Sequence, residues 1–381
     1  MAAGKFYTID PWLEPFIYII EKRIRKCLLK EKELKGNQSL VDFALGHYYY
    51  GLHKDKNGWV FREWAPNATE IYIIGVFNNW KEKASYRMEK INNYGNWEIK
   101  LPPEALKHGD LFKLSVHWDG GKGERIPSYA TRVVQDNKTK IFSAQVWDPP
   151  KPYSWSSLDF KPAPGSPLIY EAHVGMATSE ERTGTYAEFT KNIIPRIVKA
   201  GYNTIQLMAI QEHPFYGSFG YHVSNFFAAS SRFGTPEELK ELVDTAHASG
   251  LRVIMDLVHS HAVKNINEGL GLFDGSPGQY FYDNDRRIHK AWDSLCFDYG
   301  KNSVIHFLLS NCRYWLEEYN FDGFRFDGIT SMIYYDHGLE RNFTTYDEYY
   351  NDEQDIDALV YLYLANKLIH AFKPEALTIA E

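Results

Sequence analysis

Short runs of apolar residues alternate with amphipathic segments through the second half of the chain. The apolar runs are candidate β-strands and cover residues 168–175, 204–210, 252–258, 323–329 and 376–381. Their nearly uninterrupted hydrophobic character is typical of parallel strands that are covered on both faces. Strands that alternate with helices in this way predict an α/β domain, built either as a barrel or as an open sheet.

Helix signals occupy the segments between these strands. Thr185 with Glu188, and Thr235 with Glu238, have the spacing of a capping box, in which each side chain satisfies a free N–H group of the other residue. Residues 303–320, SVIHFLLSNCRYWLEEYN, place apolar side chains at helical spacing along one face. These patterns predict helices that pack on the strands.

The first part of the chain follows different patterns. Residues 10–36 have an Asp–Pro start, apolar residues at helical spacing and a final glycine, and so predict one amphipathic helix. From residue 46 to residue 148, short β-rich runs are separated by Gly, Asn, Pro and Asp, which predicts a small β-sandwich. Residues 148–167 hold six prolines and indicate a semi-rigid connector.

We therefore divide the chain into four parts. They are an N-terminal helical segment (1–44), a β-sandwich (45–150), a proline-rich linker (151–167) and an α/β domain (168–381).

Two long connections in the α/β domain favour a barrel over an open sheet. Residues 259–302 follow the third candidate strand, and residues 330–352 follow the fourth. Unstructured connections of this length are uncommon unless they have a function, and in a (β/α)8 barrel the chemistry lies on the loops after the strands. No glycine-rich phosphate motif follows the first strand. We expect a (β/α)8 barrel of which this chain holds about five strands.

Composition limits the possible partners. The chain has 381 residues, 24 % of them charged, and a net charge of −7, which does not suggest a nucleic-acid or membrane partner. No apolar run approaches the roughly 18 residues of a membrane span, and the start lacks the pattern of a signal peptide. Three scattered cysteines, Cys27, Cys296 and Cys312, fit neither a disulfide framework nor a metal-ligand spacing. We expect a cytoplasmic protein.

Aromatic residues are unusually frequent. The chain contains 10 Trp, 27 Tyr and 23 Phe, which together make up 16 % of its residues. Core packing explains most of them, whereas a subset in exposed positions would form a surface that stacks on sugar rings. Only their positions in the fold can separate these two interpretations.

Polar residues gather at the predicted strand ends. Asp256 and His261 follow the third strand, Arg325 and Asp327 lie on the fourth, and Glu381 closes the fifth. Strand alternation places Arg325 and Asp327 on the same face. Two carboxylates at one barrel rim can serve as nucleophile and general acid/base in glycosidic bond cleavage, and a separation of about 5 to 5.5 Å gives the retaining reaction. We expect the Arg325 guanidinium to lower the pKa of Asp327 and to hold its geometry.

Two other interpretations apply to the same residues. Arg325 and Asp327 alone are also compatible with a buried ion pair that only stabilises the fold, but Asp256, His261 and Glu381 at the same rim make this the weaker interpretation. His259 and His261 suggest zinc, yet alternate residues face opposite ways and no third ligand is apparent. A contact with a sugar hydroxyl suits His261 better than a metal.

Several motifs resemble the α-amylase superfamily. MDLVHSHAVKN (255–265), FDGFRFDGITSM (321–332) and TIAE (378–381) are similar, in this order, to its first three signature regions. Residues 207–250 resemble more closely the eukaryotic 1,4-α-glucan (glycogen) branching enzymes. Residues 62–80, REWAPNATEIYIIGVFNNW, resemble the carbohydrate-binding module that precedes the barrel in branching and debranching enzymes.

This resemblance implies roles for individual residues. Asp327 would be the nucleophile, Glu381 the acid/base and Arg325 the residue that positions Asp327. Asp256, His261 and Tyr221 would line the subsite for the attacked glucose, although Tyr221 also fits a buried core position. In the module, Trp64 and Trp80 would stack on glucan, as would Phe77 and Trp97, although core packing is the commoner role for each of these four.

The sequence departs from the superfamily pattern in three places. Ser260 stands where the superfamily often has Asn, and His222 stands where branching enzymes usually have Gln. The fourth signature region, a His–Asp pair, would lie beyond Glu381 together with three barrel strands. We therefore expect the chain to be the N-terminal part of a longer enzyme that, on its own, is inactive and prone to aggregate.

The resemblance implies a transglycosylase that cleaves α-1,4-glucan and transfers the chain to a 6-hydroxyl, which forms α-1,6 branches in glycogen. It would need no metal and no organic cofactor, and its partner would be an α-glucan such as glycogen, amylose or an amylopectin-like polymer. Two alternatives remain at this point. One is an isoamylase-type debranching hydrolase, and the other is a non-catalytic glucan-binding protein.

Overall fold

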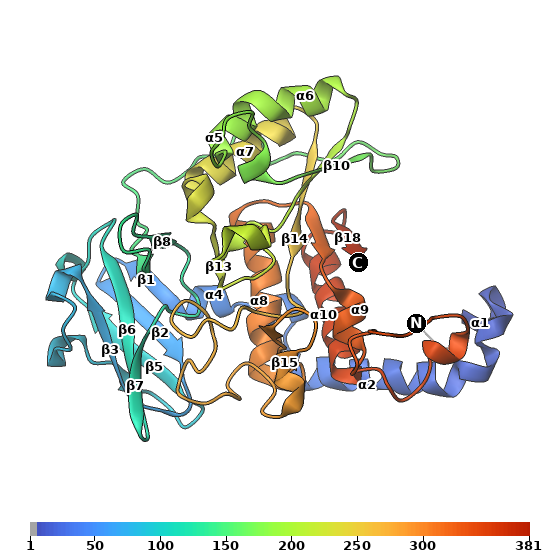
Figure 1. Cartoon of the computed structure of the whole chain (residues 1–381), viewed down its shortest axis with the longest axis horizontal. Coiled ribbons are helices and arrows are strands. Elements are labelled where there is room, and N and C mark those ends of the chain that lie inside the picture. The colour runs from blue at the N-terminus through green and yellow to red at the C-terminus, as the bar shows by residue number, and fades with distance from the viewer. Residues whose placement is uncertain (1–5) are drawn as a thin grey trace.

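A computed structural model describes the backbone of residues 6–381 and the side chains from Thr8 onward. Figure 1 shows a β-rich unit on one side, a layer of strands and helices in the middle, and a long N-terminal helix that runs along the base of the molecule. Residues 1–5 of the expected N-terminal segment lie outside the described part.

The N-terminal segment is helical but is not one continuous α-helix. It contains α1 (Phe6–Ile9), the 3-10 helix η2 (Pro11–Phe16) and α2 (Ile17–Lys35). Asp10 caps η2, where its Oδ1 accepts a hydrogen bond of 3.0 Å from the Trp12 backbone N–H. The expected single helix is thus wrong in its first turns, because Pro15 lacks the N–H donor that a continuous α-helix requires there. Two short helices follow, α3 (Leu40–Phe43) and α4 (Gly46–Tyr49).

Two antiparallel sheets form the predicted β-sandwich. One sheet has the order β1-β2-β5-β4, from β1 (Gly51–Asp55), β2 (Gly58–Trp64), β5 (Asn96–Leu101) and β4 (Glu89–Lys90). The other has the order β3-β6-β9-β8, from β3 (Ala68–Gly75), β6 (Leu111–Trp118), β9 (Phe142–Gln145) and β8 (Val133–Gln135), with β7 (Gly121–Arg125) paired to β6. Phe61 and Phe112 meet edge to face between the sheets, with ring centroids 6.2 Å apart. The sandwich is confirmed.

The five candidate strands of the second half form one parallel sheet. They are β10 (Ile169–Ala172), β11 (Thr204–Leu207), β14 (Arg252–Leu257), β17 (Gly323–Phe326) and β18 (Leu377–Ala380), and they lie side by side in chain order. Sequential parallel strands with helices between them are the arrangement of a (β/α) barrel. The predicted fold class is therefore confirmed, with the sheet open between β10 and β18.

Helices lie between successive strands of this sheet. They are α5 (Tyr186–Glu188), the π-helical turn η7 (Phe189–Ile193), α6 (Ile194–Lys199), α7 (Pro236–Ala248), α8 (Asn302–Glu318), α9 (Ile329–Ile333) and α10 (Ile356–Phe372). Both predicted capping boxes, at Thr185 and Thr235, are present. Two hairpins, β12 (Gln211–Glu212) with β13 (Asn225–Ala229) and β15 (Ile288–His289) with β16 (Ser294–Leu295), lie in the connections. In the described chain no helix is both long and apolar enough to cross a bilayer.

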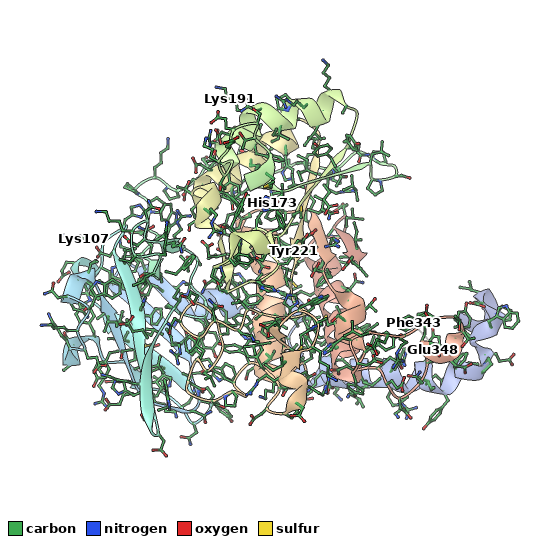
Figure 2. The ribbon with its side chains drawn as sticks, viewed as in Figure 1. Lys107, His173, Lys191, Tyr221, Phe343 and Glu348 are labelled. Atoms are coloured by element: carbon green, nitrogen blue, oxygen red, sulfur yellow. The ribbon has the colours of Figure 1, made fainter. Side chains whose placement is uncertain are left out.

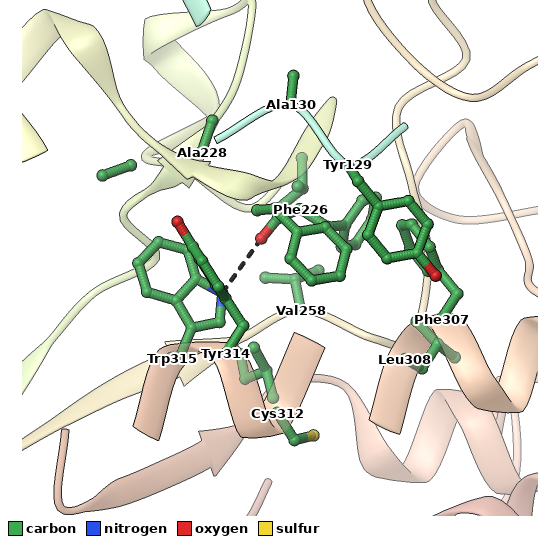
Figure 3. Packing of buried hydrophobic residues seen from close by; sticks show 14 of the residues in the cluster. Tyr129, Ala130, Phe226, Ala228, Val258, Phe307, Leu308, Cys312, Tyr314 and Trp315 are labelled. Atoms are coloured by element: carbon green, nitrogen blue, oxygen red, sulfur yellow. Dashed lines mark hydrogen bonds between the residues drawn. The ribbon is translucent and has the colours of Figure 1, made fainter. Parts of the chain in front are cut away.

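The sandwich and the α/β domain share a hydrophobic core. Tyr129 of the sandwich stacks on Phe227 of β13 at 4.6 Å. It also packs edge to face on Phe307 of α8 (Figure 3). The Trp315 indole of α8 donates a hydrogen bond of 3.1 Å to the carbonyl oxygen of Phe226. Because the Tyr129 contacts cross from one unit to the other, they join the sandwich to the α/β domain.

Candidate functional site

The carboxyl ends of three neighbouring strands carry the candidate catalytic residues. Asp256 of β14 and Arg325 of β17 are register partners, and Glu381 directly follows β18. As the alternation predicts, Phe324 and Phe326 are buried on one face of β17, while Arg325 and Asp327 extend together on the other. The parallel pairing of the strands brings residues far apart in the sequence to a single edge of the sheet.

One guanidinium group contacts all three carboxylates. Arg325 Nη1 lies 2.9 Å from Asp256 Oδ2 and 3.1 Å from Asp327 Oδ1, and Arg325 Nη2 lies 3.3 Å from Glu381 Oε1. The other carboxylate oxygen of Glu381 accepts a hydrogen bond of 2.9 Å from the Gly328 N–H. Asp327 and Glu381 therefore project toward the same cation from adjacent strands.

Backbone hydrogen bonds fix the Asp327 turn. The Asp327 N–H donates to the Leu257 carbonyl at 3.1 Å, and the Glu381 N–H donates to the Phe326 carbonyl at 3.2 Å. The Ile329 N–H donates to the Glu381 carbonyl at 2.7 Å. Gly328 has φ +68°, a left-handed conformation that glycine adopts without strain. A short turn thus joins the strand that carries Asp327 to α9 while it remains bonded to Glu381.

Asp256 is the most buried member of the group. Its side chain is inaccessible to solvent and accepts hydrogen bonds from Gln206 Nε2 at 2.8 Å and from the Tyr221 hydroxyl at 2.6 Å, in addition to Arg325. Tyr221, labelled in Figure 2, is half-buried: it packs against the hydrophobic core and directs its hydroxyl to this carboxylate. Gln206 was not among the sequence candidates, because a glutamine within an apolar strand gives no distinctive signal.

The net pKa of Asp327 is raised, although Arg325 acts on it in the expected direction. Burial raises the pKa to about 6; Arg325 opposes this effect, and the nearby Glu381 carboxylate adds to it. Asp256 also has a pKa raised to about 6, mainly by burial, with Tyr221 and Arg325 acting in the opposite direction. The sequence showed the ion pair but not the burial, and burial is the larger effect here.

The two histidines of HSH have different surroundings. His261 Nε2 donates to the Tyr221 carbonyl at 2.9 Å, and burial lowers its pKa to about 3, so the ring is neutral. His259 is buried in the core, where it hydrogen-bonds with Tyr361 and Asn311. Among the described residues, no group of three or more His, Cys, Asp or Glu side chains could hold a metal ion.

The four candidate aromatic residues of the module differ in exposure. Trp97 is only 4 % exposed and belongs to the core, and Phe77 stacks on Tyr86. Trp64 is half-buried, packs edge-on against Tyr280 at 5.2 Å and lies where the module meets the α/β domain. Trp80 is 38 % exposed and lines a surface pocket. Trp64 and Trp80 are therefore accessible enough to contact a ligand, whereas Trp97 is not.

Comparisons with known proteins agree with this arrangement. Residues 49–130 match the family described as carbohydrate-binding module 48 (isoamylase N-terminal domain), and residues 194–276 match the alpha amylase catalytic domain. A 1,4-alpha-glucan-branching enzyme from Yarrowia lipolytica is 48 % identical over 96 % of this chain and 54 % of its own length. One from Dictyostelium discoideum is 45 % identical over 98 % of this chain and 55 % of its own length. The chain thus spans about half the length of these relatives.

A solved structure shows the same fold. A mutant pullulanase from Paenibacillus barengoltzii, complexed with maltotriose, superposes with a TM-score of 0.69 over 92 % of this chain and 56 % of that chain. Its sequence identity is 19 %, so this similarity concerns the fold alone.

Proposed function

We propose that the protein is a 1,4-alpha-glucan-branching enzyme, which cleaves α-1,4-glucan and transfers the released chain to a 6-hydroxyl to form an α-1,6 branch. Its similarity to the branching enzymes of Yarrowia lipolytica and Dictyostelium discoideum supports this proposal. The observation that carries this proposal is the set of three carboxylates around the Arg325 guanidinium at the ends of β14, β17 and β18. The reaction we propose is a retaining double displacement.

In the first step, Asp327 attacks the anomeric carbon of the scissile glucose. Glu381 donates its proton to the glycosidic oxygen, the bond to that oxygen breaks, and the donor chain becomes covalently attached to the Asp327 carboxylate. In the second step, Glu381 takes the proton of a glucan 6-hydroxyl, whose oxygen replaces Asp327 at the same carbon. Two inversions give overall retention of the α configuration.

Local charge supports these roles. Three carboxylates surround one guanidinium, so the group carries excess negative charge when all three are ionised. This charge stabilises the positive charge that develops on the sugar ring in an oxocarbenium-like transition state. With its pKa at about 6, Asp327 is mostly ionised at neutral pH, as a nucleophile must be.

We assign substrate contacts to the polar and aromatic residues around this group. Asp256 and Tyr221, joined by their 2.6 Å hydrogen bond, and the neutral His261 would bind hydroxyls of the attacked glucose. Trp64 and Trp80 would bind more distant parts of an α-glucan such as glycogen, because sugar C–H faces stack on indole rings. We propose four functional parts for the chain: an N-terminal helical segment (1–44), a carbohydrate-binding module (45–150), a linker (151–167) and the N-terminal portion of the catalytic barrel (168–381).

The decisive assay separates branching from hydrolysis. When the native protein acts on amylose, branching should weaken iodine staining while the number of reducing ends stays almost constant. A rise in reducing ends from branched glucan would instead show debranching, an alternative that the similarity to branching enzymes does not favour. A non-catalytic binding protein would be retained on glycogen but would change neither the iodine staining nor the number of reducing ends. Its retention would also be the same in the Asp327→Asn variant.

We also propose a cytoplasmic location. The three cysteines are free and buried, and burial raises the pKa of the Cys27 thiol to about 11. Free thiols are typical of a reducing compartment. Fractionation of the source cells would test this location.

A further inference from the structure

Three aromatic rings form a column beside the Asp327 turn. Trp292 stacks on His289 with ring centroids 4.2 Å apart and an interplanar angle of 1°. His337 lies against His289 at 4.0 Å and 31°. The rings come from the 259–302 connection and from the connection that follows α9, so the column joins two segments that have little regular secondary structure of their own.

Hydrogen bonds fix the middle ring. The backbone N–H groups of Ala291 and Trp292 donate to His289 Nδ1 at 3.2 and 3.1 Å. The ring proton therefore lies on Nε2, which donates to the Ser331 hydroxyl. His337 Nδ1 donates to the Ser331 carbonyl at 3.1 Å. Ser331 lies in the first turn of α9, so the column holds the start of the helix that follows Asp327.

The outer ring reaches the site itself. Trp292 lies 4.9 Å from the His261 ring, measured between centroids. Its indole also covers Gly328, where an added Cβ would lie 2.9 Å from the ring and 2.9 Å from the Ser260 hydroxyl. Gly328 donates its N–H to Glu381 and directly follows Asp327. One indole thus packs on the turn that links the two carboxylates.

We propose that Trp292 and His289 are positioning residues for the reaction, with His337 as their outer support. They hold the Asp327–Gly328 turn so that the Asp327 carboxylate and the Gly328 N–H keep their orientation toward the sugar and Glu381. A glycine has no side chain with which to anchor such a turn, so a rigid ring packed against it supplies the constraint. A displacement of about 1 Å at a reacting group can lower the rate about 100-fold. This inference rests on the proposed function.

Trp118 offers a matched control. It is also a half-buried tryptophan, and it also covers a glycine of the 259–302 connection, Gly275, where an added Cβ would lie 2.2 Å from its ring. It belongs to β6 of the sandwich and contacts Arg125 instead of the Asp327 turn. Trp118→Leu should therefore have a structural effect similar to that of Trp292→Leu without disturbing the carboxylates.

Two measurements on the native protein test the proposal. Trp292→Leu should lower kcat about 100-fold and leave KM within about threefold of the parent value, because the loss concerns the reacting groups and not the binding of distant glucose units. Trp292→Phe, which keeps a flat ring, should restore most of kcat. Hydrogen–deuterium exchange should increase at residues 328–333 in Trp292→Leu and stay at the parent level there in Trp118→Leu.

A second variant examines the column as a unit. His289→Leu should reproduce the loss of kcat, and the double variant with Trp292→Leu should lose little more than either single variant, since both act through the same turn. Parent-like kcat and parent-like exchange at residues 328–333 in Trp292→Leu would overturn the positioning role. A parent protein without activity on glucan, combined with the expected change in exchange, would overturn the proposed function and leave the positioning of the turn supported.

Discussion

Replacing Glu63 by glutamine should remove a pH-dependent part of the protein's stability. Glu63 is a fully buried residue of β2, where its carboxylate accepts hydrogen bonds from the Ser128 N–H at 2.9 Å, the Ser128 hydroxyl at 2.5 Å and the Trp64 N–H at 2.8 Å. None of these hydrogen-bond partners carries a positive charge that would neutralise the carboxylate. Burial therefore dominates and raises the pKa of Glu63 from 4.5 to about 7.

The size of the effect follows from this pKa. The folded protein binds the proton of Glu63 more tightly than the unfolded chain does, so the favourable contribution is complete below about pH 4.5 and is lost as the pH rises through about 7. A rise from 4.5 to about 7 corresponds to about 3 kcal/mol. Glutamine does not titrate, so the difference in unfolding free energy between parent and Glu63→Gln should change by about this amount across the window.

Urea unfolding at about pH 5 and about pH 8 measures this difference. The unfolding free energy of the variant minus that of the parent should be about 3 kcal/mol larger at the higher pH than at the lower. Any constant cost of the new amide cancels in this comparison. Glu89→Gln, an exposed glutamate of the same sheet, controls for the loss of a carboxylate. A parent-to-variant difference that stays constant across this range would refute the reasoning that burial controls Glu63.

Three further predictions concern the site. The kcat/KM of the native protein should fall about tenfold per pH unit below about pH 6, because the Asp327 nucleophile, with its pKa raised to about 6, must be ionised to act; a pH–rate profile flat to about pH 5 would contradict this. Tyr221→Phe removes the hydrogen bond to Asp256 and should lower kcat/KM about tenfold in steady-state assays, whereas an unchanged value would remove Tyr221 from the site. Trp80→Ala should weaken retention in glycogen affinity electrophoresis and leave kcat on short glucans unchanged, and unaltered retention would argue against its role.

Regular elements could be predicted from the sequence because their patterns are local. The five parallel strands, the sandwich and both capping boxes follow from periodicity and turn residues. The shared face of Arg325 and Asp327 follows from strand alternation. The break at the start of α2 was missed, because Pro15 lies in a segment whose apolar spacing still fits a helix.

Features that depend on tertiary environment could not be predicted. The pKa of Asp327 depends mainly on burial, which composition does not reveal, and burial outweighs the lowering effect of Arg325 that the sequence predicted. Trp292 and His289 lie in a connection without periodicity, so no pattern links them to Gly328. The same holds for the module, where the sequence proposes Trp64, Trp80 and Trp97 alike, and only the fold separates the buried Trp97 from the other two.

The most direct test of the central claim is to capture the covalent intermediate. The native protein carrying Glu381→Gln, treated with an α-maltooligosyl fluoride, should form the glycosyl enzyme, because the fluoride leaves without acid assistance, and should then resolve it slowly. Peptide mass spectrometry should find the sugar on Asp327, and the same treatment of a protein that also carries Asp327→Asn should give no adduct. A sugar attached to a different residue, or amylose branching that persists in Asp327→Asn, would contradict the account.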